Sequence, residues 1–304
     1  MKRRELLQKS AAFGLFAAIP FPPGAKSSAI AADLNRSAAK AGPLKPPAHG
    51  SIPVAFLVSE GAVLIDFCGP WEVFGNVMLP GRQDPPFHLY TVSETLKPFR
   101  AGGMQIVPDY TIETAPAPKV IVIPAQNNDS QAVLEWIRKS TKSSDVTMSV
   151  CTGAFLLAQT GLLAAKAATT HHASYVELAT KFPELHVMRG VRFVEDGNLA
   201  SSGGLSSGID LAFRVVERYY GREVAAQTAF DMEYQGQGWM DRESNAVYAK
   251  ARASANGHPL CAVCSMAVDV RSAPTSAYKD HTYYFCSQDH KAQFDGAPAK
   301  FIAD

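Results

Sequence analysis

The chain has 304 residues, of which 47% are hydrophobic and 19% are charged, and its formal net charge is +1. This composition is that of a globular protein and excludes a disordered, collagen-like or coiled-coil chain. A charge this close to zero argues against nucleic acid as a partner, because general nucleic-acid binders carry a basic surplus. Five cysteines are too few for a disulfide scaffold in a chain of this length.

Residues 1–32 have the organisation of a signal peptide. Arg3 and Arg4 stand in a basic start, residues 11–20 are apolar and uncharged, and Ala29 opens an A-x-A-like cleavage pattern. The paired arginines resemble a twin-arginine export signal, and a Sec signal or a membrane anchor is the alternative. The apolar run is too short to span a bilayer stably. We therefore expect a periplasmic or otherwise exported protein with no membrane span after removal of the signal.

Residues 33–50 are rich in Ala, Pro and Lys and lack hydrophobic periodicity, which predicts a linker. From residue 51 to residue 240, short apolar runs alternate with helical patterns. Strands are predicted over 53–58, 88–92, 120–123 and 146–150, and helices over 69–79, 129–140, 154–163, 173–182, 208–220 and 223–234. The dipeptide Asp196-Gly197, flanked by apolar runs, predicts a hairpin between 191–194 and 199–202.

This alternation predicts an α/β fold with a mostly parallel sheet and helices on both faces. Ligands of such folds bind at the carboxyl ends of the strands. Cys151 lies at such an end, where the strand 146–150 passes directly into a helix. The position resembles a nucleophile elbow, a sharp turn that presents a reactive atom over the sheet edge.

The residues around Cys151 also suit a reactive thiol. Gly153 permits a close approach of the backbone, and the free N–H groups at the start of a helix favour the thiolate. We therefore expect an exposed, nucleophilic cysteine. The alternative is a small cysteine buried as part of the core.

Four segments resemble the ThiJ/PfpI superfamily, which has the class I glutaminase-like fold, and within it the isonitrile hydratase branch. They cover about residues 52–240 in the order that the branch has. The segments are Leu64-Ile-Asp66-Phe-Cys-Gly-Pro70-Trp-Glu-Val-Phe74, Val150-Cys-Thr-Gly153, Ala168-Thr-Thr-His171 and Ser201-Ser-Gly-Gly-Leu-Ser-Ser-Gly-Ile-Asp210. The resemblance implies a flavodoxin-like sheet flanked by helices, with Cys151 as nucleophile at its elbow, and commonly a homodimer.

The resemblance also implies roles for the residues near the nucleophile. Asp66 would face Cys151 and act as general acid and base, whereas its alternative role is a turn or cap residue. A carboxylate beside a thiolate should have a raised pKa, because two negative charges repel each other at short range. Thr152 would offer its backbone N–H to the reacting group. His171 would lie beside the cysteine, as a catalytic or equally as a structural histidine.

Two features depart from the family pattern or complicate it. The family has Pro-Gly-Gly where this chain has Pro-Ala125-Gln126, so the substrate or oxyanion would be bound by groups of Ala125, Gln126 and Gly153. The side-chain amide of Gln126 is one candidate donor. Cys68, two residues after Asp66, either packs against its neighbours or forms a disulfide with Cys151.

The resemblance implies a cysteine-dependent hydratase that converts an isonitrile to an N-substituted formamide without a cofactor in this domain, whereas the residues themselves show a thiol with a carboxylate partner. Cys151 would attack the isonitrile carbon, and Asp66 would protonate that carbon and then activate water. Glyoxalase-like or protease-like reactions use similar residues. A different class of function, a non-catalytic redox or heavy-metal sensor on the same fold, is the alternative.

A second linker is predicted over residues 241–258. Residues 259–304 contain side chains of the types that bind metal ions. Cys261 and Cys264 form a CxxC pair, and Cys286 and His290 are four residues apart at the start of a predicted helix. Four such ligands suit Zn²⁺, and thiolates also suit Cu⁺.

The C-terminal segment resembles the YHS domain, a small module associated with heavy-metal binding. The resemblance rests on Cys-x-x-Cys-x-Met-x-Val-Asp269, on the Tyr-Tyr-Phe-Cys286-Ser run and on the closing Lys-x-x-Phe294. His290 stands where the family has Cys, which moves the preference toward zinc. A disulfide of Cys261 with Cys264 or Cys286 is the alternative.

Overall fold

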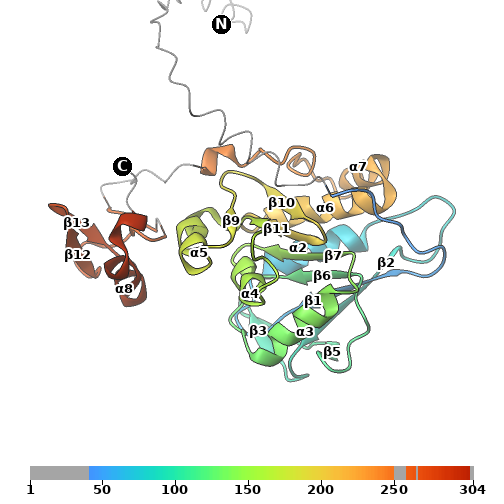
Figure 1. Ribbon diagram of the computed structural model, residues 1–304. Coiled ribbons are helices and arrows are strands. Elements are labelled where there is room, and N and C mark those ends of the chain that lie inside the picture. Colours follow the sequence, from blue (N-terminus) through green and yellow to red (C-terminus); the bar gives the residue numbers. More distant parts are fainter. Residues whose placement is uncertain (1–40, 250–257, 265, 302–304) are drawn as a thin grey trace, which may run out of the picture. The chain divides into compact units, whose positions relative to one another are not determined.

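The computed structural model describes residues 41–249, 258–264 and 266–301 (Figure 1). The predicted signal peptide 1–32 and the linker segments 33–40 and 250–257 lie outside the described residues. Within the described part of the chain, no helix combines the length and the apolar character needed to cross a bilayer.

A seven-stranded sheet forms the centre of the domain (Figure 1). Neighbouring strands are parallel except at one edge, where the last strand turns back in a hairpin. In the order in which they pair, the strands are β10 (Phe193–Asp196), β11 (Leu199–Ser202), β7 (Val146–Val150), β6 (Val120–Ile123), β1 (Ile52–Leu57), β2 (Phe87–Ser93) and β5 (Tyr110–Thr111). The predicted α/β fold with a mostly parallel sheet is confirmed.

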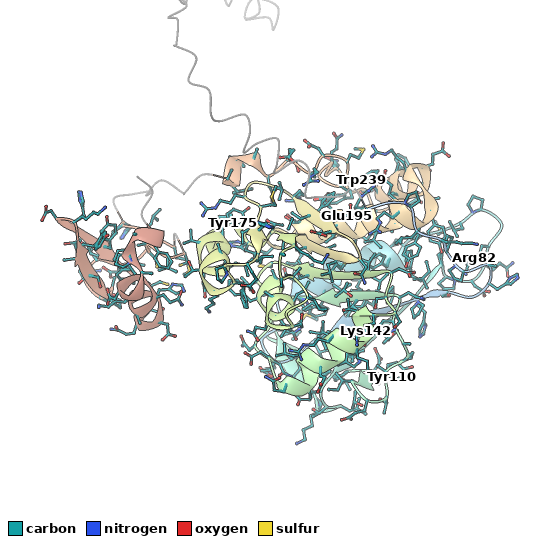
Figure 2. All side chains as sticks on the ribbon, viewed as in Figure 1. Arg82, Tyr110, Lys142, Tyr175, Glu195 and Trp239 are labelled. Atoms are coloured by element: carbon teal, nitrogen blue, oxygen red, sulfur yellow. The ribbon has the colours of Figure 1, made fainter. Side chains whose placement is uncertain are left out.

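Helices cover both faces of the sheet, as the side chains in Figure 2 show. α2 (Leu64–Gly75) and α6 (Ser207–Tyr220) pack on one face, and α7 (Arg222–Asp231) packs on α6. α4 (Gly153–Gln159) packs on the other face together with α3 (Gln131–Thr141). Val54 and Phe56 of β1 belong to the core on the first face, and Ala55 and Leu57 to the core on the second. This two-sided burial explains the continuous apolar strands.

Several predicted boundaries are wrong by a few residues. α2 begins at Leu64, five residues before the predicted start, and therefore contains Pro70 in its interior. α3 is capped by Ser130, whose hydroxyl accepts the N–H of Val133 at 3.2 Å, and not by Asp129. α4 ends at Gln159, because the chain turns at Gly161 with φ at +79°.

Other differences concern short elements. The hairpin is confirmed, but Asp196 pairs with Leu199, so the turn is Gly197-Asn198 and not Asp196-Gly197. The helix predicted over 173–182 is a 3₁₀ turn followed by α5 (Tyr175–Lys181). Two further pairs were not predicted from the sequence: β3 (Phe99–Ala101) with β4 (Met104–Ile106), and β8 (Ala167–Ala168) with β9 (His186–Val187).

The described ends of both predicted linkers contact the domain. The N–H of Leu44 donates to the carbonyl of Arg218 at 2.7 Å, and the Arg218 side chain donates to the carbonyl of Gly42 at 3.0 Å. Asn245, in the second segment, is buried and accepts a hydrogen bond from Arg192 at 3.2 Å. These contacts place residues 41–44 and 245 on the surface of the domain that carries α6.

The C-terminal module has a hairpin of β12 (Thr275–Tyr278) and β13 (His281–Tyr284), followed by α8 (Gln288–Gly296). Ser287 caps α8 by accepting the N–H of His290 at 3.2 Å. The small core of the module includes Phe285 and Phe294, both fully buried, together with Cys261 and Cys264. Two of the predicted metal ligands are therefore part of this core.

Candidate functional site

Cys151 occupies the turn between β7 and α4 with φ at +58°, a strained value for a residue with a side chain. Its N–H donates to the carbonyl of Gly203 at 3.1 Å, and its own carbonyl accepts the hydroxyl of Thr170 at 2.9 Å. These bonds tie the turn to the ends of two neighbouring segments. The predicted strand-to-helix turn is present, but Cys151 is only 7% exposed, so the expectation of an exposed thiol is wrong.

Gly153 explains how the turn packs so closely. A Cβ atom on this residue would overlap the carbonyl oxygens of Ile123 and Pro124 at the end of β6. Any other residue type would therefore push α4 away from the sheet. The predicted need for glycine at this position has a steric cause.

Burial raises the pKa of the Cys151 thiol to about 11, and the nearby Asp66 carboxylate adds to this rise. The N–H groups of Thr152 and Leu205 and the Thr152 hydroxyl favour the thiolate, but they do not offset these two effects. The helix start therefore does not by itself produce a thiolate, contrary to the sequence argument. The sequence analysis did not predict a role for Leu205. Its backbone has φ at +49° directly after Gly203-Gly204, and its N–H contacts the Cys151 sulfur.

Asp66 lies in the first turn of α2 and is completely buried. Its Oδ2 atom accepts the N–H of Ala125 at 3.1 Å, whereas Oδ1 is buried and accepts no hydrogen bond from the residues that the structure describes. Burial raises the pKa of Asp66 to about 6, although the Ala125 N–H and the Cys151 thiol both act in the opposite direction. Asp66 is thus in contact with Cys151 and within a helix, not in a turn.

The two residues share one proton near neutral pH. The carboxyl group of Asp66 is mostly ionised above pH 6, and the Cys151 thiol keeps its proton up to about pH 11. Transfer of that proton to the carboxylate would create a thiolate without a change in the net charge of the pair. The arrangement therefore supplies a nucleophile and a proton carrier together.

Replacement of Asp66 by Asn should stabilise the protein above pH 7. Between about pH 4 and pH 6 the folded protein holds a proton that the unfolded chain releases, so the free energy of unfolding falls as the pH rises through this range. Removing the buried charge should add ~2–3 kcal/mol at pH 7.5 and almost nothing at pH 4. Urea unfolding at both pH values would measure this. Asp84→Asn, at an exposed position, is the control, and a less stable Asp66→Asn variant at pH 7.5 would contradict the expectation.

Ala125 and Gln126 are already engaged in hydrogen bonds. The N–H of Ala125 donates to Asp66, and the side-chain amide of Gln126 donates to the carbonyl of Leu57 at 2.8 Å. One of the two N–H donors of the Gln126 amide is therefore already used, and its use as an oxyanion donor stays a prediction. The N–H groups that contact the reactive sulfur come from Thr152 and Leu205.

His171 lies beside the segment Gly203-Gly204, whose Gly203 carbonyl accepts the Cys151 N–H. Its ring packs against Gly204, where a Cβ atom would overlap it, and its Nδ1 atom accepts the N–H of Ala173 at 3.3 Å. Burial lowers the pKa of His171, which keeps the ring neutral near pH 7. Together with Leu205 and Tyr248, this ring lines a cavity of about 210 Å³.

The five cysteines are all free. Cys68 is exposed on α2, and its pKa is raised by partial burial and by Glu72. No disulfide joins it to Cys151 in this structure.

The four predicted metal ligands come together in the C-terminal module. Ligand atoms of Cys261, Cys264, Cys286 and His290 all lie within 4.8 Å of one another. The Cys264 and Cys286 sulfurs are 3.6 Å apart, and His290 Nδ1 is 3.1 Å and 3.5 Å from the sulfurs of Cys286 and Cys261. Zn–S bonds of ~2.3 Å in a tetrahedron give ligand separations of ~3.8 Å, so the donor set fits such an ion.

The chemistry of the module is also consistent with metal binding. Hydrogen bonds from Cys264 and from the His290 ring lower the pKa of Cys261, which favours the thiolate that a metal ligand needs. A sulfur separation of 3.6 Å between Cys264 and Cys286 is far longer than an S–S bond. The residues present could therefore hold a metal ion of the zinc type.

Comparisons with known proteins agree with this fold. The profile of the DJ-1/PfpI family matches residues 53–218. An isonitrile hydratase from Pseudomonas putida is 30% identical over 190 residues, which cover 60% of this chain and 79% of the relative. A crystal structure of a ThiJ/PfpI family protein from Pseudomonas syringae is 24% identical and superimposes with a TM-score of 0.55, covering 71% of this chain and 83% of that one.

A regulator is also among the relatives. The HTH-type transcriptional regulator GbdR from Pseudomonas aeruginosa is 22% identical over 178 residues, which are 57% of this chain and 48% of the regulator. The chain thus spans about half the length of that relative. The shared domain occurs both in an enzyme and in a regulator, so the function has to be argued from the site.

Proposed function

The chain belongs to the DJ-1/PfpI family, and we propose that it hydrates an isonitrile to an N-substituted formamide. The observation that carries the proposal is the buried pair of Cys151 and Asp66, in which the pKa of the carboxyl group is raised and its Oδ1 atom has no hydrogen-bond donor among the described residues. The relation to an isonitrile hydratase supports it. Formation of the formamide from a simple alkyl isonitrile by the purified mature protein tests it.

The first step forms a carbon–sulfur bond. Asp66 takes the proton of the Cys151 thiol, and the thiolate attacks the terminal carbon of the isonitrile. Asp66 then delivers the same proton to that carbon, and the product is a thioimidate bound to Cys151. The N–H groups of Thr152 and Leu205, which already contact the sulfur, hold it in place during the attack.

The second step releases the product. Asp66 accepts a proton from water as the oxygen attacks the thioimidate carbon, and it passes this proton to the nitrogen. The carbon–sulfur bond then breaks, the hydroxyl proton of the tetrahedral intermediate returns to the sulfur, and the N-substituted formamide leaves. Atoms balance over both steps, with one water consumed for each isonitrile. The cavity beside Leu205, His171 and Tyr248 offers room for the substituent on nitrogen.

The pH dependence of the reaction should reflect the shared proton. The active form of the pair holds one proton, so kcat/KM should rise with an apparent pKa near 6 and stay level until the second group titrates near 11. Initial rates measured between pH 5 and pH 10 would show the acid limb and a plateau. An increase in rate near pH 8.5–9, the range of an ordinary thiol, would contradict the mechanism, because it would mean that a free thiolate must form first.

The alternative of a redox sensor is weakened by the state of the nucleophile. Sensor cysteines combine a low pKa with solvent access. Cys151 is 7% exposed, and burial raises its pKa to about 11. A thiol in this state reacts slowly with peroxide unless a neighbour removes its proton, which is the role that hydration assigns to Asp66.

For the rest of the chain we propose three further assignments. Residues 1–32 would direct export by the twin-arginine route, residues 51–240 would be the catalytic domain, and residues 259–304 would be a YHS-type domain. Cys261, Cys264, Cys286 and His290 would hold Zn²⁺ or Cu⁺, which would stabilise the small core of that domain. Export of an already folded protein would allow the metal to be bound before transport.

A further inference from the structure

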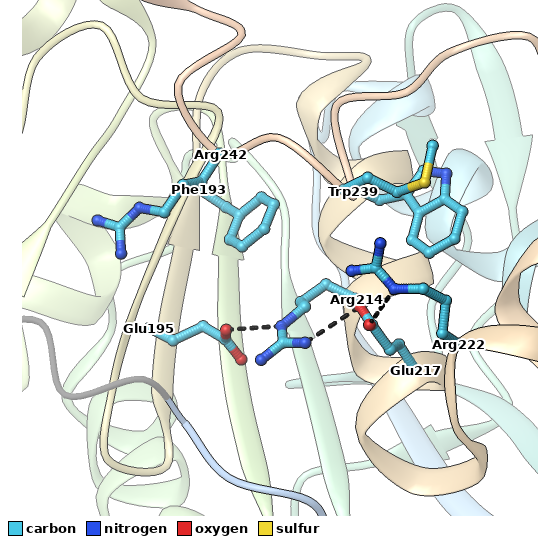
Figure 3. Close-up of a pocket in the computed structure, with 8 residues that line it drawn as sticks. Phe193, Glu195, Arg214, Glu217, Arg222, Trp239 and Arg242 are labelled. Atoms are coloured by element: carbon cyan, nitrogen blue, oxygen red, sulfur yellow. Dashed lines mark hydrogen bonds and ion pairs between the residues drawn. The ribbon is translucent and has the colours of Figure 1, made fainter.

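A cavity of about 330 Å³ lies beside the edge strand β10 (Figure 3). Neither Cys151 nor Asp66 lines this cavity. Phe193 and Glu195 reach it from one face of β10, because alternate residues of a strand point the same way. Arg214 and Glu217 reach it from α6, on which residues three apart lie on one face. The walls therefore combine charged groups with aromatic ones.

The ion pairs around the cavity leave a surplus of positive charge. The carboxylate of Glu195 binds Arg214 at 2.9 Å and Arg218 at 3.1 Å. The carboxylate of Glu217 binds Arg214 at 3.0 Å and Arg222 at 2.9 Å. Every oxygen of the two carboxylates thus already has a guanidinium partner, and three guanidinium groups share two negative charges.

Two arginines at the cavity have unused donors. The terminal amino groups of Arg222 make no hydrogen bond with the described residues, although its Nε atom donates to Glu217 and its guanidinium lies 5.6 Å from the centre of the Trp239 ring. In Arg242 the Nε atom is buried and makes no hydrogen bond within the described chain; the nearest carboxylate, that of Glu243, is 3.5 Å away. Each guanidinium can pair with both oxygens of one carboxylate.

We propose that this cavity binds a small organic carboxylate. One acid group matches the single surplus charge and the open terminal amino groups of Arg222, whereas the Arg242 guanidinium points to the opposite side of the cavity (Figure 3). The apolar part of the ligand would contact the ring of Phe193 and the side chain of Met240, which line the same cavity. An inorganic oxyanion would satisfy the arginines but would leave these apolar walls uncovered.

Titration calorimetry with benzoate on the mature protein tests the proposal. Saturable binding of benzoate is expected, and neutral benzamide of the same shape should bind at least about tenfold more weakly. Arg222→Gln should weaken benzoate binding about tenfold or more, whereas Arg242→Gln, at the opposite side of the cavity, should weaken it less. Lys139→Gln, an exposed substitution on α3, should leave it unchanged.

The variants are suited to separate binding from folding. The Arg222 side chain is 57% exposed and that of Arg242 is 32% exposed, and both substitutions keep most of the side chain, so thermal unfolding should change little. Absence of saturable benzoate binding, equal binding of benzamide, or unchanged binding in Arg222→Gln would overturn the proposal. Because the readout is binding, its failure is independent of whether an isonitrile is hydrated.

Discussion

Replacing Cys151 by Ala is expected to abolish formamide production, and Asp66→Asn should reduce it by about 10²–10⁴-fold. The first variant removes the atom that attacks the isonitrile carbon. The second keeps an oxygen that can accept the N–H of Ala125 at the same place but cannot carry a proton between sulfur, carbon and water. Product formation from an alkyl isonitrile, followed by chromatography against the authentic formamide, measures both effects.

The two variants remove different groups of the same first step. In Asp66→Asn the thiol remains but loses its base, so neither the thioimidate nor the formamide should form. This variant is expected to be more stable than the parent above pH 7, because it removes a buried charge, and lost activity would therefore not be due to unfolding. Cys68→Ala is the matched control, since Cys68 is exposed on the same helix.

Certain outcomes would refute the mechanism. Formamide production that survives Cys151→Ala would mean that another group performs the attack. Full activity in Asp66→Asn would mean that the proton comes from elsewhere, with His171, whose ring lies by the same loop, as the next residue to replace. No formamide from the parent protein would remove the proposed reaction and return the domain to a binding or sensing role.

The central fold could be predicted because strands that are buried on both faces of a sheet consist largely of consecutive apolar residues. β1 and β6 are short, mostly apolar runs, and each residue of β6 and β7 is buried. The start of α2 could not be predicted in this way. Gly69-Pro70 is typical of the beginning of a helix, yet α2 begins five residues earlier and Pro70 lies in its interior. Packing of α2 against α6 outweighs the local preference.

The sequence predicted which residues form the candidate site better than it predicted their solvent exposure and pKa values. The order of motifs placed Cys151 and Asp66 together, and the structure does the same. Exposure and pKa depend on what covers the sulfur, and that cover comes from segments distant in the chain, such as Leu205. A helix start favours a thiolate locally, whereas burial and a neighbouring carboxylate favour the thiol more strongly here. The sequence next to Cys151 does not indicate this burial or the neighbouring carboxylate, so the raised pKa could not be predicted from it.

Removal of metal should unfold the C-terminal module while the large domain stays folded. The module has a core centred on Phe285 and Phe294, which is small for a segment of this length, and Cys261 and Cys264 are buried within it. Structural zinc contributes ~10–16 kcal/mol to the folding of comparable small sites. Strong chelation of the purified protein should therefore make residues 259–304 sensitive to protease, and mass spectrometry under native conditions should show loss of one ion per chain.

The ligand variants make this expectation specific. Cys261→Ser combined with Cys264→Ser removes half of the donor set and should abolish metal binding, whereas Cys68→Ser, outside the cluster, should retain one ion. Hydratase activity should persist in the double variant, because the sulfur and carboxyl groups of the catalytic pair belong to the large domain. A metal-free protein with a protease-resistant module and a mass two hydrogens lower would instead identify a disulfide as the element that stabilises this core.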